Sequence, residues 1–420
     1  MANRSLPILM PNLPWQKYSC HGCGDCCRDF TVQLRERDLK KLSEQGWTER
    51  LGGEVVQSFR GQSYLSRKDD GSCIFLDPHG LCKIHAEFGF SEKPIACQVF
   101  PFNIAPDASG IKVGLNFLCK SVQRNEGSAL GTHQKDIRRF IRAIPELARP
   151  APDPPLASGE SAATRSEVAK LVDSLDHWLS RSDLDFSNRL DGLAFISTCL
   201  GDATLKNVRN ERFSDLLDTL FSVLEEELRL QPPSAASRRQ DRLLRQAVFT
   251  RTEDPRIGTG KGRVRSTLSQ LKRSRAMRLG RGKTPFLTAE LPVGVDFRTV
   301  GGVAGCEESL DSVSIAELFT RYLRATLHSG RAWGSAYYGW SVTDGLQALV
   351  LNAACILWIA KLNSASASRT VASLEDYQRA IGRVDRQSGR APWLGNPVER
   401  VRLNYLRMDH GFRRLIYSYL

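Results

Sequence analysis

The chain has 420 residues, of which 41% are hydrophobic and 25% are charged, as is usual for a folded, water-soluble protein. This length exceeds that of one typical domain, so we expect two. The net charge of +13 comes almost entirely from one basic segment. The most apolar stretch, residues 346–362, contains Gln347, Asn352 and Lys361, which argues against a membrane span and predicts a buried helix.

The first residues show no secretory signal. The apolar patch Leu6–Met10 is interrupted by Pro7, is followed by Pro11, and leads to no cleavage-like segment. We therefore expect the protein in the cytoplasm.

Residues 1–125 are expected to form a cysteine-cluster metal-binding domain. Eight of the 11 cysteines lie between positions 20 and 119. In a reducing compartment this density favours metal over disulfides, whereas in an oxidising one the same residues could form four bridges. The candidate metal ligands are Cys20, Cys23, Cys26, Cys27, Cys73, Cys82, Cys97 and Cys119.

The first four of these cysteines form the run Cys20-x-x-Cys23-x-x-Cys26-Cys27. Two successive Cys-x-x-Cys turns bring thiolates to one side of a tight loop, as in bacterial ferredoxins, where closely spaced cysteines bind one iron–sulfur cluster. Because Cys27 is adjacent to Cys26, we expect its side chain to point elsewhere. We expect it to serve a second metal or to reach a distant partner.

The other four cysteines follow singly. Cys73 and Cys82 flank the turn-forming residues 77–80, so a hairpin would bring them together. His85 follows Cys82 at a ligand-like spacing, although such a histidine is more often a surface residue. Eight thiolates could hold two zinc ions, two iron–sulfur clusters, or one cluster and a structural site. The expected cofactor is an iron–sulfur cluster, with 4Fe–4S favoured, or zinc; spacing does not choose between them.

Residues 126–164 are expected to form a Pro/Ala-rich linker, densest in proline at residues 149–155. Residues 165–420 have helical periodicity and predict a mainly helical domain. Nothing suggests the strand–helix alternation of a doubly wound sheet. The predicted fold class is therefore α+β, with a small, loop-rich cysteine domain followed by a mainly α-helical domain.

Apolar periodicity predicts helices over residues 168–179, 213–224, 316–327 and 343–362. Ser166 is the expected N-cap of the first. Asn396 and Pro397 begin a final helix. One face of that helix is expected to carry Val398, Val401, Tyr405, Met408 and Phe412.

A basic segment covers residues 238–283. It contains 15 Lys or Arg and three acidic residues, a net charge of +12. It could dock an acidic protein, bind nucleic acid, or form a solvated surface. Because Phe249 is nearly the only aromatic residue in it, we do not expect it to bind nucleic acid by stacking.

The cysteines occur in an ordered set of motifs: Cys20-x-x-Cys23-x-x-Cys26-Cys27, Cys73-Ile74-Phe75-Leu76, Gly80-Leu81-Cys82-Lys83-Ile84-His85, Lys93-Pro94-Ile95-Ala96-Cys97, Phe100-Pro101-Phe102 and Asn116-Phe117-Leu118-Cys119. Over residues 18–125 this set resembles the YkgJ-like cysteine-cluster family, described as a zinc- or iron-chelating domain with eight cysteines. Longer members include the flagellin lysine N-methylases, which are similar in layout to this chain. That resemblance implies an iron–sulfur cluster, S-adenosylmethionine as methyl donor, and a protein substrate such as flagellin.

We therefore expect a metal- or iron–sulfur-binding protein whose candidate activity is protein lysine N-methylation. The sequence has no Gly-rich methyltransferase loop after a strand, so the donor would bind at an open iron of the cluster or on the helical region. The alternative is a non-catalytic, zinc-stabilised interaction module whose basic segment docks an acidic partner. Acid-labile sulfide distinguishes the two, because only a cluster contains it.

Overall fold

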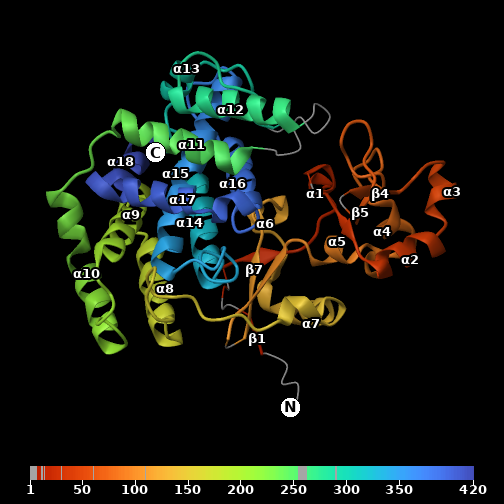
Figure 1. Ribbon diagram of the computed structural model, residues 1–420, viewed down its shortest axis with the longest axis horizontal. Helices are drawn as coiled ribbons and strands as arrows, with labels where there is room; N and C mark the ends of the chain where they lie inside the picture. Colours follow the sequence, from red (N-terminus) through yellow and green to blue (C-terminus); the bar gives the residue numbers. More distant parts are fainter. Residues whose placement is uncertain are drawn as a thin grey trace. The chain divides into compact units, whose positions relative to one another are not determined.

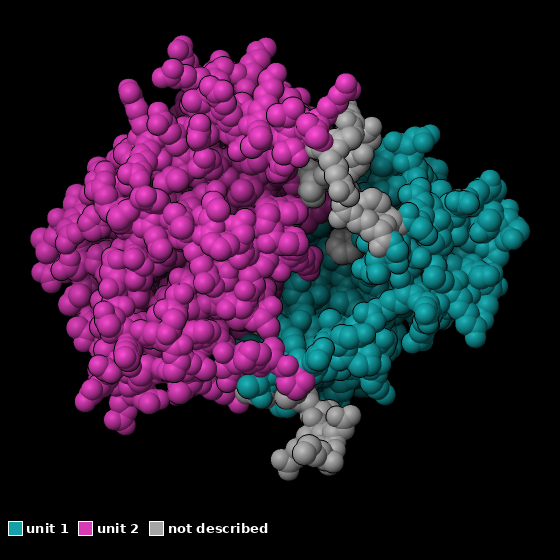
Figure 2. Space-filling view, in the orientation of Figure 1, with its two compact units in different colours: residues 1–149 teal, residues 150–420 magenta. Residues whose placement is uncertain are grey.

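The computed structural model describes residues 7–10, 13, 15–29, 31–59, 61–108, 110–253, 263–288 and 291–420. The chain divides into two compact units, residues 1–149 and 150–420, which are coloured separately in Figure 2. The division falls inside the expected linker, residues 126–164. Part of that segment, Gln134–Ala143, forms a helix of unit 1.

The described part of unit 1 contains three small sheets (Figure 1), with strand orders β1-β7-β6, β2-β8 and β3-β5-β4. The β1–β7 pair is parallel and the other pairs are antiparallel. The strands are β1 Ile8–Leu9, β2 Lys17–Tyr18, β3 Gln33–Leu34, β4 Val56–Phe59, β5 Gln62–Leu65, β6 Phe102–Pro106, β7 Ile111–Leu115 and β8 Ser128–Ala129.

The helices of unit 1 are short, and glycines end two of them, at Gly52 and Gly89. Gly46 and Gly52, both with φ 65°, enclose one of these helices in left-handed backbone that favours glycine. Long loops therefore make up much of the unit. The helices are α1 Asp25–Asp29, α2 Glu36–Glu44, α3 Trp47–Leu51, α4 Lys83–Phe88, α5 Ile95–Val99, α6 Lys120–Arg124 and α7 Gln134–Ala143.

Unit 2 is helical, with no regular strand among its described residues. The helices are α8 Arg165–Ser180, α9 Phe186–Asp202, α10 Glu211–Leu230, α11 Arg238–Thr252, α12 Arg263–Leu279, α13 Phe297–Gly301, α14 Ser312–His328, α15 Val342–Ser366, α16 Leu374–Gln387, α17 Pro397–Arg407 and α18 Gly411–Tyr419 (Figure 1). Together the units confirm the predicted α+β class.

Helix α15 is the core of unit 2. It is long and apolar enough to cross a membrane, but its most apolar window is entirely buried inside the protein. It packs against α9, α16 and α18. The buried helix predicted from the apolar run is therefore confirmed.

The predicted starts of two helices had different outcomes. Thr164, not Ser166, caps α8, because the Thr164 hydroxyl accepts a hydrogen bond from the backbone N–H of Glu167. The prediction of Ser166 was wrong by two positions. Asn396 caps α17 as predicted, with its side chain accepting from the backbone N–H of Glu399.

The apolar face predicted for the last helix is not a core face. Val398 is 64% exposed and Met408 is 53% exposed, and α17 buries Glu399 and Arg402 on its other side. Left-handed backbone at Asp409 then separates α17 from α18. The continuous helix to Phe412 was therefore a wrong prediction, since a kink divides it.

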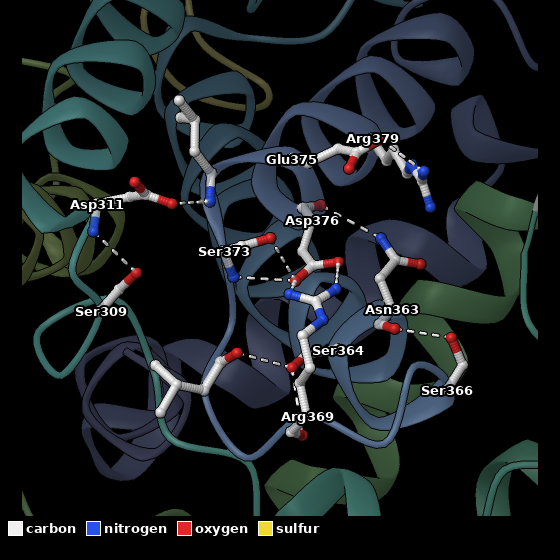
Figure 3. Close-up of polar contacts among 12 residues, drawn as sticks. Ser309, Asp311, Asn363, Ser364, Ser366, Arg369, Ser373, Glu375, Asp376 and Arg379 are labelled. Atoms are coloured by element: carbon white, nitrogen blue, oxygen red, sulfur yellow. Dashed lines mark hydrogen bonds and ion pairs between the residues drawn. The ribbon is translucent and has the colours of Figure 1, made fainter.

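Buried polar residues fix the turn between α15 and α16 (Figure 3). The carboxylate of Asp376, 1% exposed, accepts hydrogen bonds from Arg369 Nη1 at 2.7 Å and Nη2 at 2.8 Å. It also accepts from the backbone N–H of Ser373 at 2.9 Å. These bonds satisfy the carboxylate and cap α16, so the cluster has a structural role.

Candidate metal centre

All eight candidate cysteines lie in unit 1 and line two cavities that share part of their walls. The larger cavity, of about 260 Å³, is lined by Cys20, Cys23, Cys26, Cys27, Cys82, Cys97 and Cys119. The smaller, of about 40 Å³, is lined by Cys26, Cys27, Cys73, Cys82 and Cys97. Residues separated by almost 100 positions in the sequence are thus brought to one region.

The first cysteines occupy a tight loop between β2 and α1. Gly22 and Gly24 have φ of 66° and 74°, in the left-handed region that favours glycine. A Cβ added at Gly24 would lie only 2.5 Å from the carbonyl oxygen of Gly80. Glycine at position 24 therefore allows this loop to pack closely against the turn that precedes Cys82.

The turn predicted at residues 77–80 is confirmed. The backbone N–H of Asp77 donates to the carbonyl of Leu81 at 2.8 Å, and Leu76 pairs with Cys82 across the turn. The backbone N–H of Cys73 donates to the carbonyl of Cys27, also at 2.8 Å. This bond ties the hairpin to helix α1, so that Cys27 joins Cys73 and Cys82 around the smaller cavity.

Burial keeps most of these thiols protonated. Burial raises the pKa of Cys73 to about 11 and that of Cys119 to about 11, although nearby backbone N–H groups act in the opposite direction. Burial likewise raises the pKa of Cys97. Since metals bind thiolates, each of these ligands must release a proton when metal binds near neutral pH.

The pKa values of Cys26 and Cys27 depend on more than burial, because the two thiols interact with each other. Their Sγ atoms lie 4.0 Å apart. The hydrogen bond from Cys26 lowers the pKa of Cys27, and the same bond raises the pKa of Cys26. Of the two thiols, Cys27 therefore loses its proton more readily.

Lys93 is a charged residue in both cavity walls and is only 8% exposed. Burial acts to lower its pKa, but the negative charges that Cys97 and Cys82 carry once they are thiolates outweigh burial and raise it. Its cation therefore offsets thiolate charge in a dry setting. Sequence reasoning assigned it no role; its position four residues before Cys97, in the same motif, was the available signal.

The histidines near the cysteines differ in position. His85 lines the larger cavity, and its ring centroid lies 5.8 Å from that of Phe90. His79 lines neither cavity. His21, which lies between Cys20 and Cys23 in the sequence, also lines the larger cavity, so His21 and His85 are both placed where they could add a ligand.

The cysteine thiols are suitable ligands for a soft metal ion, but their sulfur atoms do not already have the spacing of a coordination site. A tetrahedral zinc ion with bonds of about 2.3 Å needs sulfurs about 3.8 Å apart. Among the residues that the structure describes, no three His, Cys, Asp or Glu side chains lie close enough to hold one ion as they stand. Because thiol ligands give up their protons to bind metal, the energy of metal binding also stabilises the folded unit 1.

Comparison with known proteins supports metal chelation. Residues 19–124 match the model of the CxxCxxCC family, described as "Putative zinc- or iron-chelating domain". The match supports metal binding by unit 1. This CxxCxxCC domain contains all eight cysteines and covers less than half of the chain.

An uncharacterized protein of Methanocaldococcus jannaschii, MJ0939, is 25% identical over 135 residues, which are 31% of this chain and 44% of that protein. This chain therefore spans less than half the length of that relative. No solved structure matches the chain.

Unit 2 contains a different cavity, of about 440 Å³. Arg413 in its wall binds Asp191 through two hydrogen bonds of 2.7 Å. None of the cysteines lines it, and Cys355, in α15, is fully buried elsewhere. The metal chemistry of the described residues is therefore concentrated in unit 1.

Proposed function

We propose that the CxxCxxCC domain binds an iron–sulfur cluster on the loop that carries Cys20, Cys23 and Cys26. One observation carries this proposal: these three residues line a cavity of about 260 Å³. A single ion needs far less space, since about 10–15 Å³ already admits a water molecule. The repeated Cys-x-x-Cys spacing is also that of cluster-binding loops.

Anaerobic reconstitution with iron and sulfide tests the proposal. The full chain should acquire the visible absorption of a cluster and, after reduction, a paramagnetic resonance signal. The matched variant Cys20→Ser/Cys23→Ser should acquire neither, because serine is a poor ligand for a soft metal. Equal cluster formation in both proteins would contradict the proposal.

We also propose a reaction for this protein, the methylation of lysine side chains. The resemblance to flagellin lysine N-methylases suggests that S-adenosylmethionine donates a methyl group to a lysine amine, which releases a proton and S-adenosylhomocysteine. Cys20 and Cys23 are exposed, which supports access of a small molecule to the loop. If the donor binds iron, one iron must lack a cysteine; Cys119 is the candidate to leave, because it comes from a distant segment.

The donor should then change the resonance spectrum of the reduced full chain, and methyl transfer should be detectable on a protein substrate such as flagellin. Cys119→Ser provides the comparison, because it frees the iron that Cys119 would hold. An unchanged spectrum in both proteins, without transfer to any lysine-bearing protein tested, would remove the methylase proposal and leave cluster binding intact.

The second candidate is an interaction module, which the outward face of helix α12 favours. Val264, Leu268 and Leu271 are 73%, 60% and 60% exposed, although their spacing is that of one helix face. Exposed Arg265 and Lys272 flank them. The opposite side buries Arg273, which pairs with Glu253 at 3.3 Å, and Met277.

This face suits a partner helix that combines apolar and acidic residues. Part of the basic segment, residues 254–262, lies outside the described residues. An acidic amphipathic peptide should bind the full chain in a fluorescence anisotropy assay, and more weakly as salt rises. Leu268→Ser/Leu271→Ser should weaken binding at least tenfold, and equal binding by both proteins would exclude this docking face.

A further inference from the structure

We infer that the eight cysteines form two separate sites: an open site of Cys20, Cys23, Cys26 and Cys119, and a closed site of Cys27, Cys73, Cys82 and Cys97 that takes a single divalent ion such as zinc. This inference rests on the proposed metal binding and assigns each thiol to one site. It gives the closed site a structural role and leaves the cluster to the open one.

Cavity walls provide the first argument. Cys20, Cys23 and Cys119 line only the larger cavity, and Cys73 lines only the smaller. The remaining four cysteines line both. A tetrahedral site needs four ligands. One of the four shared cysteines must therefore belong to the open site, and the other three to the closed site.

The apolar core of unit 1 decides that assignment. Cys73 is part of this core, together with residues such as Phe75. Three of the shared cysteines pack against the same core, namely Cys27, Cys82 and Cys97. Cys26 does not belong to that group, so it is the shared residue that joins the open site.

The local geometry of helix α1 explains how two adjacent residues serve different sites. Consecutive side chains on a helix are about 100° apart around its axis. The carbonyl of Cys27 accepts the hydrogen bond from the backbone N–H of Cys73, which holds these two residues of the closed site next to each other. Cys26 then continues the Cys-x-x-Cys series that begins at Cys20.

The size of the smaller cavity indicates what the closed site takes. Its volume is about 40 Å³, and Val32, Leu65 and Phe75 form apolar walls around it. This is room for an ion and not for a polynuclear cluster with its inorganic sulfide. Four thiolates around a divalent ion leave two negative charges, and the buried cation of Lys93 offsets one of them.

The neighbouring substitutions Cys26→Ser and Cys27→Ser test the division in the full chain. Each protein is purified anaerobically and reconstituted, and its iron, sulfide and zinc are measured per chain. Cys26→Ser should lose the cluster and keep one zinc ion. Co²⁺ exchanged for that zinc should then show the absorption of a tetrahedral four-thiolate site. Cys27→Ser should instead lose the zinc and keep the cluster.

The division is overturned if the two variants lose the same metal, or if Cys26→Ser loses both. Should Cys27→Ser fail to fold, Cys119→Ser still decides, because it must retain the zinc ion; loss of zinc there contradicts the division. A wild-type chain that binds no metal would instead contradict the proposed function. Two zinc ions in the wild type and one in Cys26→Ser would refute the cluster and support the division.

Discussion

Cys26 and Cys27 have Sγ atoms 4.0 Å apart, yet of the two only Cys27 packs against the apolar core of unit 1. One peptide bond therefore connects the loop that carries Cys20 and Cys23 to the hydrophobic interior. Metal bound on the interior side should stabilise the fold, whereas the loop side is open to solvent and to small molecules.

Removal of metal should loosen unit 1 and spare unit 2. The ligands come from distant segments that meet only in the folded unit, so binding energy is also folding energy. After anaerobic treatment with a chelator, hydrogen exchange should accelerate at α4 and α5 of the full chain. Exchange in α15 should stay slow, because that helix is buried in unit 2. Unchanged protection of α4 and α5 would contradict the coupling.

Cys23→Ser should reduce the metal content far more than Cys355→Ser. Cys23 lines the larger cavity, whereas Cys355 is fully buried in α15 and lines neither of the two unit 1 cavities. Elemental analysis of the two variants, purified side by side, measures this. Equal metal in both would exclude Cys23 as a ligand.

Lys93→Met should lower the reduction potential of the cluster. The buried cation stabilises the more negative, reduced form, so its removal makes reduction harder. Dye-linked titration of the reconstituted full chain measures the potential. Lys120→Met is the control: Lys120 lines the same larger cavity but its side chain is 33% exposed, so the shift should be smaller. A potential unaffected by Lys93→Met would show that this charge does not act on the cluster.

The sequence was sufficient for features that depend on local patterns. The turn at residues 77–80 and the burial of α15 follow from turn-forming residues and from a long apolar run, and both are confirmed. The exposed face of α17 could not be predicted, because periodicity reveals an apolar face but not whether anything covers it. There Glu399 turns inward to pair with buried Arg251 at 2.6 Å.

The spacing of the cysteines in the sequence also does not show which of them share a metal site. Cys27, Cys73 and Cys97 meet only through long-range packing around the core of unit 1. The role of Lys93 could not be predicted for the same reason, because its burial among the thiols depends on the fold. The ligand identities themselves remain a prediction that the metal analyses must test.

Glu167→Gln should destabilise unit 2 by about 2 kcal/mol at pH 7, allowing for solvent screening. Burial of Glu167 opposes its charge, but hydrogen bonds from Arg209 and from the backbone N–H groups of Asn210 and Thr164 outweigh this and lower its pKa to about 2. A lowered carboxyl pKa stabilises the fold above the ordinary value of 4.5, and the stabilisation disappears as pH falls from there toward 2.

Calorimetry at several pH values should thus show a difference between wild type and Glu167→Gln that is full at pH 7 and shrinks below about pH 4.5. Exposed Glu211 provides the control, because Glu211→Gln should change little at any pH. A difference that is constant down to pH 2 would show that the effect is not due to the carboxylate charge.

The central claim is that the cysteines of unit 1 hold an iron–sulfur cluster. The most direct measurement is the amount of iron and acid-labile sulfide in one anaerobic sample of the full chain, with zinc measured in parallel. The account predicts iron and sulfide in equal amounts together with one zinc ion per chain. Zinc without sulfide, or no bound metal, would contradict it.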